Sequence, residues 1–197
     1  MILYCATTNP GKLGEFRLAA SRFSSRIVVE TIPGLEQIEP CPETGDTFEA
    51  NAVQKALYYS RFVDGPLFAD DSGLEVDALA GAPGVVSARF AGPGSTDADN
   101  NRLLLEKMLG RPDRRARFAC VVALARRGSL WKTFRGEVEG FLLEAPRGES
   151  GFGYDPLFFY PPYGRTLAEV SAEEKLRVSH RGQALEKMFR FLVSSSE

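Results

Sequence analysis

Strand-like and helix-like segments alternate along this chain, and one hairpin interrupts the alternation. Short apolar runs at 1–6 (MILYCA) and 26–30 (RIVVE) predict strands, and the segment from Lys12 to Phe23 between them has helical spacing. Further on, two extended runs at 116–125 and 130–143 are joined by RRGS, which is a hairpin signal. The combination predicts an α/β fold with a mixed sheet flanked by helices, arranged as two lobes around a cleft.

The remaining segments complete this predicted architecture. The chain has 197 residues, enough for a single domain of two lobes over residues 1–197. The stretch PLFADD (66–71) reads as a strand that ends in two acidic residues, and Val85 to Phe90 reads as a short extended piece within a loop. Ser171 and Glu174 have capping-box spacing, which predicts the start of a helix. Other predicted helices cover residues 47–63, 97–109 and 182–193.

Charge and hydropathy exclude several classes of protein. With 24 basic and 26 acidic residues the formal net charge is −2, so a polynucleotide partner is not expected. The basic cluster at 111–117 (RPDRRAR) is interpreted as a solvated loop. No apolar run is long enough to span a bilayer, and the N-terminus lacks the pattern of a signal peptide, so a membrane partner is not expected either.

Three cysteines bear on the cellular compartment. Cys5, Cys41 and Cys120 show no CxxC or Cys/His spacing, so the sequence does not support a zinc site. Cys5 and Cys120 lie in apolar strand-like runs and are predicted to be buried thiols. An odd number of thiols without such spacing fits a reducing compartment, and we expect a soluble cytoplasmic protein.

The segment between the first predicted strand and the first predicted helix has the features of a phosphate site. Asn9 can cap the helix with its side chain, and Pro10 suits the first helical position. The free amides of that first turn attract anions, and Lys12 adds a positive charge. An ordinary capped helix with a surface lysine is the alternative. The candidate phosphate-binding residues are Thr7, Thr8, Asn9, Pro10, Gly11 and Lys12.

Asp70 and Asp71 stand together where the third strand is predicted to end, which is where ligands bind in open α/β sheets. Because neighbouring side chains of a strand point to opposite faces, the two carboxylates are expected to have different roles. A carboxylate can hold Mg²⁺, or it can orient and deprotonate an attacking water. Capping of the following turn is the alternative. Glu43, Glu49 and Asp77 are further candidates for contacts with metal or water.

Two later segments carry aromatic rings and the only histidine. In SGFGYDPLFF (150–159), Phe152 or Tyr154 could stack on a nucleobase, although aromatic side chains near turns also pack at the rim of a site. His180 and Arg181 are predicted to lie between two helices. Without a second His or a nearby Cys a zinc site is not supported, and a structural His is the alternative. Together, a magnesium site, a phosphate site and a flat ring suggest a nucleoside triphosphate.

Five segments of the sequence resemble one family, the non-canonical purine NTP pyrophosphatases, also called inosine triphosphate pyrophosphatases. The segments are Thr7-x-Asn9-x-x-Lys12, ETGDTFEANAVQKA (43–56), ADDSGLEVDALAGAPGVVSARFAG (69–92), GFGYDP (151–156) and SHRGQAL (179–185). They occur in the order of the family and span nearly the whole chain. The resemblance implies a long central mixed sheet, two lobes with the substrate cleft between them, and a homodimer.

The resemblance also implies an activity and roles for individual residues. The activity is a Mg²⁺-dependent attack of water that converts ITP, dITP or XTP into the nucleoside monophosphate and pyrophosphate, which removes deaminated purines from the nucleotide pool. Asp71 would be the proton acceptor and a metal ligand, with Asp70 beside it in the catalytic pair and Glu43 as another metal ligand. Residues 7–12 and Lys55 would hold the phosphates. Further substrate contacts would come from Ser72, Phe152, Gly153, Tyr154, Asp155, Lys175, His180 and Arg181.

The chemistry of the base explains how such a pocket would select its substrate. Hypoxanthine and xanthine present a 6-keto oxygen, which accepts a hydrogen bond, whereas adenine presents an amino group. A donor such as Arg181 or a backbone amide would be left unpaired against adenine, and unpaired buried groups reject a substrate strongly. Two other hypotheses are a pyrophosphatase of similar fold that acts on pyrimidine or modified nucleotides, and a non-catalytic nucleotide sensor. The presence of both acids in ADDSG disfavours the sensor.

Overall fold

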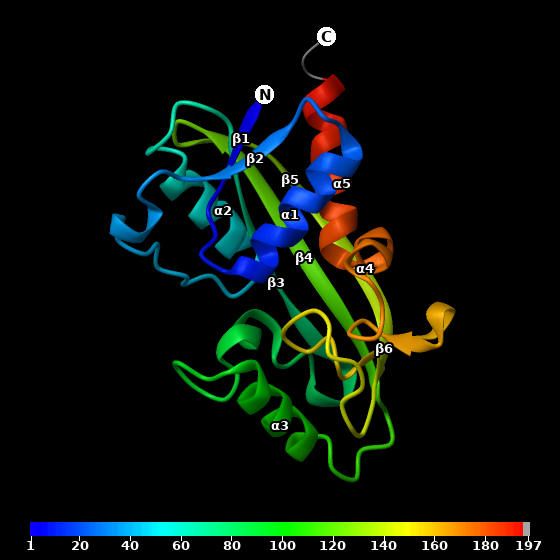
Figure 1. Ribbon diagram of the computed structural model, residues 1–197. Coiled ribbons are helices and arrows are strands. Elements are labelled where there is room, and N and C mark those ends of the chain that lie inside the picture. Colours follow the sequence, from blue (N-terminus) through cyan, green and yellow to red (C-terminus); the bar gives the residue numbers. More distant parts are fainter. Residues whose placement is uncertain (195–197) are drawn as a thin grey trace. The chain divides into compact units, whose positions relative to one another are not determined.

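A computed structural model describes residues 1–194 of the protein, and these residues form a mixed sheet of seven strands in the order β2-β1-β3-β4-β5-β6-β7 (Figure 1). The strands are β1 (Ile2–Cys5), β2 (Val28–Thr31), β3 (Leu67–Val76), β4 (Arg115–Arg126), β5 (Ser129–Leu142), β6 (Phe158–Tyr160) and β7 (Arg165–Thr166). β1 pairs in parallel with β2 and with β3, whereas β6 is antiparallel to β5 and to β7. The predicted α/β fold with a mixed sheet is confirmed.

The helices begin largely where the capping signals predict. They are α1 (Pro10–Phe23), α2 (Phe48–Tyr59), α3 (Asp97–Lys107), α4 (Ala172–Val178) and α5 (His180–Ser194). Ser171 and Glu174 form the predicted capping box of α4, with each side chain bonded to the backbone N–H of the other residue. Within the described part of the chain, no helix is long and apolar enough to cross a membrane.

The predicted hairpin is present, and its turn has a clear backbone requirement. β4 ends at Arg126 and β5 begins at Ser129, which leaves Arg127 and Gly128 as a two-residue loop. Both loop residues have positive φ angles, 50° and 76°. A two-residue loop with both φ angles positive is a type I′ turn, which matches the twist of antiparallel strands.

The chain divides into two compact units. The first unit contains Met1–Asp71, Cys120–Gly136 and the C-terminal segment from His180 onward. The second unit contains Ser72–Ala119 and Glu137–Ser179. The boundary falls within β3, β4 and β5, so each of these strands contributes residues to both units. The cleft between two lobes stays a prediction.

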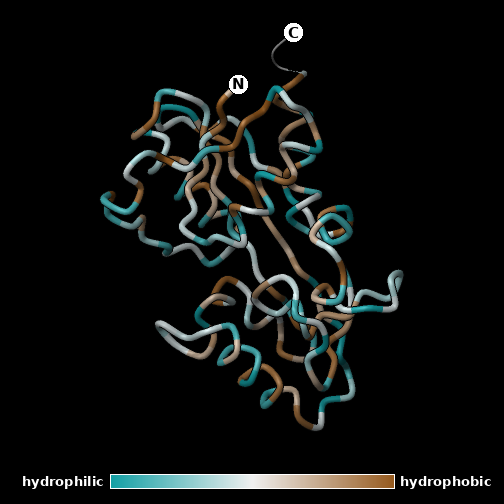
Figure 2. Tube along the Cα trace, viewed as in Figure 1, coloured by the Kyte–Doolittle hydropathy of each residue, from teal (hydrophilic) through white to brown (hydrophobic). Residues whose placement is uncertain are grey.

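Each unit has an apolar core of its own. In the first unit α1 lies beside α5, and the ring of Phe16 packs against that of Phe68 with centroids 4.9 Å apart (Figure 1). The apolar residues of α5 recur at helical spacing and are buried, namely Ala184, Leu185, Met188, Phe189 and Leu192. In the second unit Leu74 and Val76 of β3 join Leu104 of α3 in one buried cluster. Figure 2 shows the hydrophobic residues concentrated along the sheet strands.

Three expectations about local structure are wrong. β3 does not end at Asp70-Asp71 but continues to Val76, because burial of Leu74 and Val76 outweighs the turn preference of the Asp-Asp-Ser-Gly stretch. Residues 84–89 form a 3₁₀ helix instead of an extended piece, and its Ser87 hydroxyl accepts a hydrogen bond from Leu74 N at 2.9 Å. His180 and Arg181 do not lie between two helices, since they are the first residues of α5.

Candidate active site

The start of α1 has the geometry that its sequence predicts. Asn9 is the N-cap, and its Oδ1 accepts a hydrogen bond from the backbone N of Lys12 at 3.0 Å. Thr7 Oγ1 accepts a bond from the backbone N of Asn9 at 3.2 Å, and Pro10 occupies the first turn. The helix cap is therefore confirmed, and it leaves the side chains of Thr8, Asn9 and Pro10 exposed beside the positive end of the helix dipole.

Asp70 is buried and is surrounded by positive charge. Lys12 Nζ lies 3.0 Å from both carboxylate oxygens, and Arg181 Nε lies 3.3 Å from Oδ2. The same guanidinium donates through Nη1 to Glu15 Oε2 at 2.5 Å. Burial alone would raise the pKa of Asp70, but the charges of Lys12 and Arg181 outweigh it and hold the pKa well below its usual value. Asp70 is thus an ionised anchor for two cations.

Asp71 has different partners, because neighbouring side chains of β3 point to opposite faces of the sheet. Its Oδ1 lies 3.2 Å from Lys55 Nζ, and its Oδ2 accepts a hydrogen bond from Asn51 Nδ2 at 3.2 Å. Burial raises the pKa of Asp71, and the nearby ammonium groups of Lys55 and Lys12 only partly offset that effect. Two adjacent carboxyl groups therefore have pKa values shifted in opposite directions.

Lys55 connects Asp71 to Glu43. Its Nζ lies 3.2 Å from Glu43 Oε2 as well as 3.2 Å from Asp71 Oδ1, so one ammonium bridges two carboxylates. Burial alone would lower the pKa of Lys55, but Asp71, Asp70 and Glu43 outweigh it and raise the pKa. The sequence-predicted residues Glu43, Lys55 and Asp71 are thereby brought together in the first unit.

Asn51 is a site residue that sequence reasoning missed. It is only 1% exposed, and besides its bond to Asp71 its Oδ1 accepts a hydrogen bond from Gly45 N at 2.8 Å. Asn51 stands four residues before Lys55 on α2, so the two side chains share a face of the helix and hold one oxygen of Asp71 each. That i, i+4 spacing of two polar residues, which places them on one face of the predicted helix, is the signal that could have identified it.

The donor set around Asp71 fits magnesium better than a transition metal. Asp71 and Glu43 converge on one point, now occupied by the ammonium of Lys55. One or two carboxylates, completed by substrate phosphates and water, are what Mg²⁺ commonly takes from a protein. Among residues 1–194, no group of three or more His, Cys, Asp or Glu side chains could hold a metal by itself. The residues present thus suit an ion shared with a phosphate ligand.

The second unit holds another group of predicted residues. Asp155 Oδ2 accepts hydrogen bonds from Phe152 N, at 2.9 Å, and from the buried ammonium of Lys175. Lys175 Nζ also lies 4.5 Å from the centroid of the Phe152 ring, a cation–π contact. Tyr154 points into the core, where its hydroxyl donates to Ser87 O at 2.8 Å. Of the two aromatic candidates for stacking, Phe152 is the partly exposed one.

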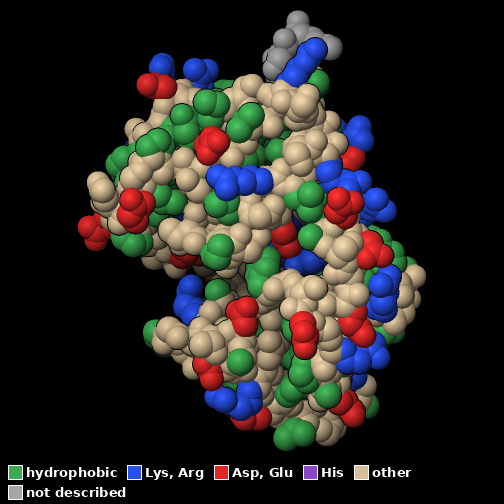
Figure 3. Space-filling view, in the orientation of Figure 1, with side chains coloured by type: hydrophobic (Ala, Val, Ile, Leu, Met, Phe, Trp, Pro, Cys, Tyr) green, Lys and Arg blue, Asp and Glu red, His purple; other side chains and the backbone are tan. Residues whose placement is uncertain are grey.

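The predicted site residues therefore fall into three groups. Lys12, Asp70 and Arg181 form the first, and Glu43, Lys55 and Asp71 form the second, both within the first unit. The third, in the second unit, is the group of Phe152, Asp155 and Lys175. Ser72 follows Asp71 on β3, and His180 is buried at the start of α5. Acidic and basic side chains are interspersed over the face shown in Figure 3.

Comparison with known proteins identifies the family. A family model described as the Ham1 family matches residues 3–191. A dITP/XTP pyrophosphatase from Exiguobacterium sp. is 48% identical over 188 residues, covering 95% of each chain. A dITP/XTP pyrophosphatase from Syntrophobacter fumaroxidans is 49% identical and covers 96% of this chain and 81% of its own. The solved Ham1 protein of Staphylococcus aureus is 37% identical with a TM-score of 0.86, covering 99% of this chain and 100% of its own. The chain belongs to the Ham1 family.

Proposed function

We propose that the protein hydrolyses non-canonical purine nucleoside triphosphates, namely dITP, ITP and XTP, to the nucleoside monophosphate and pyrophosphate. One observation carries the proposal: relatives named dITP/XTP pyrophosphatase match nearly the full length of this chain at almost half identity. The family model matches residues 3–191, which include every residue of the three side-chain groups described above. Such an enzyme would remove deaminated purines from the nucleotide pool.

In the proposed reaction Asp71 is the proton acceptor. Water attacks the α-phosphorus, the bond from that phosphorus to the bridging oxygen breaks, and the proton of the water passes to the Asp71 carboxylate. The partners of Asp71 support this role, since Asn51 and Lys55 hold one oxygen each and leave the carboxylate in a fixed orientation. A raised pKa also brings a carboxylate closer to the range in which a general base works.

The positively charged side chains near β3 are proposed to bind the phosphates of the substrate. Lys12 and the first turn of α1 would bind the triphosphate, and Lys55 would balance charge on the phosphates beside Asp71. Asp71 and Glu43 would hold Mg²⁺, which supplies positive charge to the phosphates and to the attacking water when it is bound. Asp70 is proposed to keep Lys12 and Arg181 in place, because its pKa is too low for it to accept the proton.

Base recognition is proposed for the third group, that of Phe152, Asp155 and Lys175. Phe152 would stack on the purine, with Gly153, Tyr154, Asp155 and Lys175 supporting it. Arg181 and His180 are proposed to contribute to selection of the 6-keto oxygen. A site that hydrogen-bonds this oxygen would reject adenine, because its donor would stay unpaired.

A substrate panel tests the proposal. The purified protein is incubated with dITP, ITP, XTP, ATP, GTP, dTTP and UTP in the presence of Mg²⁺, and pyrophosphate release is measured. We expect the first three to turn over fastest, and EDTA to abolish turnover until Mg²⁺ is restored. Faster release from dTTP or UTP would favour the pyrimidine alternative, and binding of dITP without pyrophosphate release would favour a nucleotide sensor.

We also propose that the enzyme is a homodimer located in the cytoplasm. The three cysteines are free thiols and buried, which is consistent with a reducing compartment. Sedimentation equilibrium would measure the oligomeric state, and a mass of one chain at micromolar concentration would contradict the dimer.

A further inference from the structure

Two side chains of α3 hold one residue of the 151–155 loop. Asp97 Oδ2 accepts a hydrogen bond from Gly153 N at 2.6 Å, and Asn101 Nδ2 donates one to Gly153 O at 2.8 Å. Asp97 and Asn101 are four residues apart, so they lie on the same face of α3. Both peptide groups that flank the Cα of Gly153 are therefore fixed by the same helix.

Gly153 is a position where such fixing matters. Its φ angle is +64°, in the left-handed region that glycine enters without strain. Glycine also has the largest backbone freedom of any residue, so an unanchored Gly153 would let the loop sample several conformations. The bond from Asp97 is charge-assisted, which makes it stronger than a bond between neutral groups.

The surroundings of the loop show why these two bonds are needed. Asp97, Asn101, Phe152 and Gly153 all line a cavity of about 1160 Å³ in the second unit. On that side the loop borders open space and not packed side chains. The residues that follow are held independently, because Tyr154 donates to Ser87 O and Asp155 is buried. Gly153 thus links this fixed segment to Phe152, whose backbone N donates to Asp155 Oδ2 and whose partly exposed ring lies against Lys175.

We propose that Asp97 and Asn101 are positioning residues that orient the Phe152 ring for stacking on the nucleobase. The inference rests on the proposed function and deepens it, since it names what sets the affinity for the nucleoside part of the substrate. The two side chains act through Gly153 and have no part in the cleavage step. Loss of either one lets the backbone at Gly153 sample other conformations, which shifts the Phe152 ring relative to Lys175, and the base then binds more weakly.

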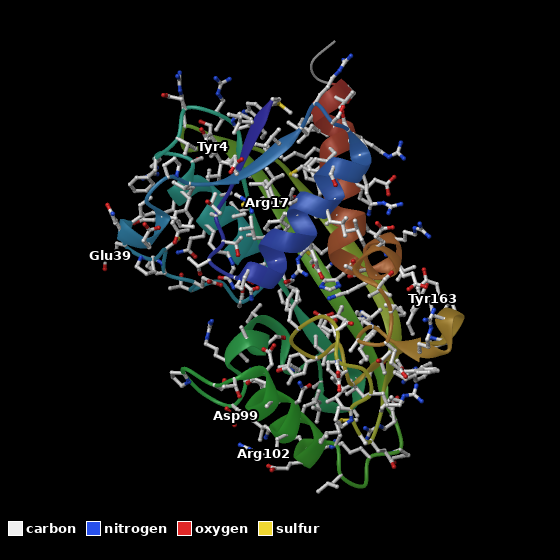
Figure 4. All side chains as sticks on the ribbon, in the orientation of Figure 1. Tyr4, Arg17, Glu39, Asp99, Arg102 and Tyr163 are labelled. Atoms are coloured by element: carbon white, nitrogen blue, oxygen red, sulfur yellow. The ribbon has the colours of Figure 1, made fainter. Side chains whose placement is uncertain are left out.

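The test compares Asp97→Ala, Asn101→Ala and the double variant with a control on the same helix. The control is Arg102→Ala, because Arg102 is exposed and pairs with Asp99 (Figure 4). KM and kcat are measured for dITP, together with the inhibition constant of inorganic tripolyphosphate, which has no base. We expect each single variant to raise KM for dITP about fivefold, the effect of one lost hydrogen bond, while kcat and the tripolyphosphate constant change less than about twofold. The double variant should exceed the single ones only slightly, because both bonds hold the same residue.

Amide hydrogen exchange at Gly153, followed by NMR, reports on the two hydrogen bonds from α3 to Gly153 without any substrate. Asp97→Ala should speed exchange of this amide about tenfold, and Arg102→Ala should leave it unchanged. Faster exchange with an unchanged KM for dITP would overturn the positioning role, as would an equal rise in the tripolyphosphate constant. If the unmodified protein releases pyrophosphate from none of the purine triphosphates, the proposed function is wrong, and that outcome is separate from the exchange result.

Discussion

At the scale of single residues, the two adjacent carboxyl groups of β3 show how environment separates chemical roles. Asp70 is 3% exposed and Asp71 is 6% exposed, so burial alone does not distinguish them. Asp70 contacts Lys12 and Arg181 directly, and their charges lower its pKa. Asp71 contacts Lys55 and shares that ammonium with Glu43, so the effect of burial is only partly offset and the pKa of Asp71 is raised. Neighbouring titratable groups whose pKa values are shifted in opposite directions are typical of acid–base sites.

The first prediction concerns Asp71→Asn. The substitution keeps the shape of the side chain but removes its charge and one of the two oxygens that accept from Lys55 and Asn51, so dITP turnover should fall at least about a hundredfold, the usual contribution of a general base. Pyrophosphate release at saturating dITP measures the loss. Thermal unfolding monitored by circular dichroism is the control, and it should show a cooperative transition near that of the unmodified protein. Undiminished turnover would remove Asp71 from the proton-accepting role.

The second prediction concerns Asp70→Asn and the pH dependence of stability. Breaking a buried ion pair costs about 3–5 kcal/mol, and the remaining bond from Arg181 to Glu15 should keep the cost near the lower end. Because the folded-state pKa of Asp70 is depressed, its stabilisation is present above the unfolded-state pKa of about 4 and is lost as pH falls below it. Urea unfolding at pH 7 and at pH 3 should therefore show a difference between unmodified protein and variant that shrinks at the lower pH. A constant difference would mean that the charge of Asp70 is not the stabilising feature.

At the scale of elements, local signals were predictable from sequence and long-range contacts were not. Asn9 and Ser171 cap helices through residues three positions away, so a short stretch of sequence contains the whole motif. The continuation of β3 depends on the core of the second unit, and no local pattern reports it. Asn101 reaches Gly153 across 52 positions in the chain, so this anchor exists only in the folded protein.

The third prediction concerns the packing of α5 against β5. A Cβ on Gly136 would lie 2.1 Å from His180 O and 2.8 Å from Ala184 N, both backbone atoms of α5 that cannot move separately. Gly136→Ala should therefore lower the free energy of unfolding by at least about 2 kcal/mol. It should also reduce dITP turnover, because the displaced end of α5 carries Arg181. Chemical denaturation and pyrophosphate release measure the two effects.

Gly14 of α1 provides the matched control for this substitution. Among residues 1–194, no atom beyond the neighbouring residues and the backbone of α1 lies within 4 Å of a Cβ built on Gly14, and the residue is inside a helix. Gly14→Ala should stabilise the protein by about 0.5–1 kcal/mol, because alanine loses less backbone freedom in a helix. If both substitutions had the same effect, close approach of α5 would not be the reason for glycine at position 136.

At the scale of the whole molecule, the fold class and the family were accessible from sequence because they depend on patterns spread along the entire chain. Five motifs in a fixed order specify the family, and alternating strands and helices specify a mixed sheet. The ion-pair partners of the carboxylates were harder to predict from sequence, since Lys55, Glu43 and Asp71 meet only after α2 packs beside β3. The same folding places all three cysteines in the interior.

The fourth prediction uses those cysteines as reporters of folding. Cys5 and Cys120 have no exposed surface, and burial raises the pKa of each thiol to about 12. Since the thiolate is the reactive form, neither should react with a thiol reagent at pH 8 unless the protein unfolds. In buffer, fewer than one thiol per chain should react in the time that free cysteine needs to react completely. In denaturant, all three thiols should react.

Cys41 is 8% exposed, so Cys41→Ser serves as the control and should remove any slow labelling of the native protein. Rapid labelling that persists in Cys41→Ser would show that β1 or β4 opens without global unfolding.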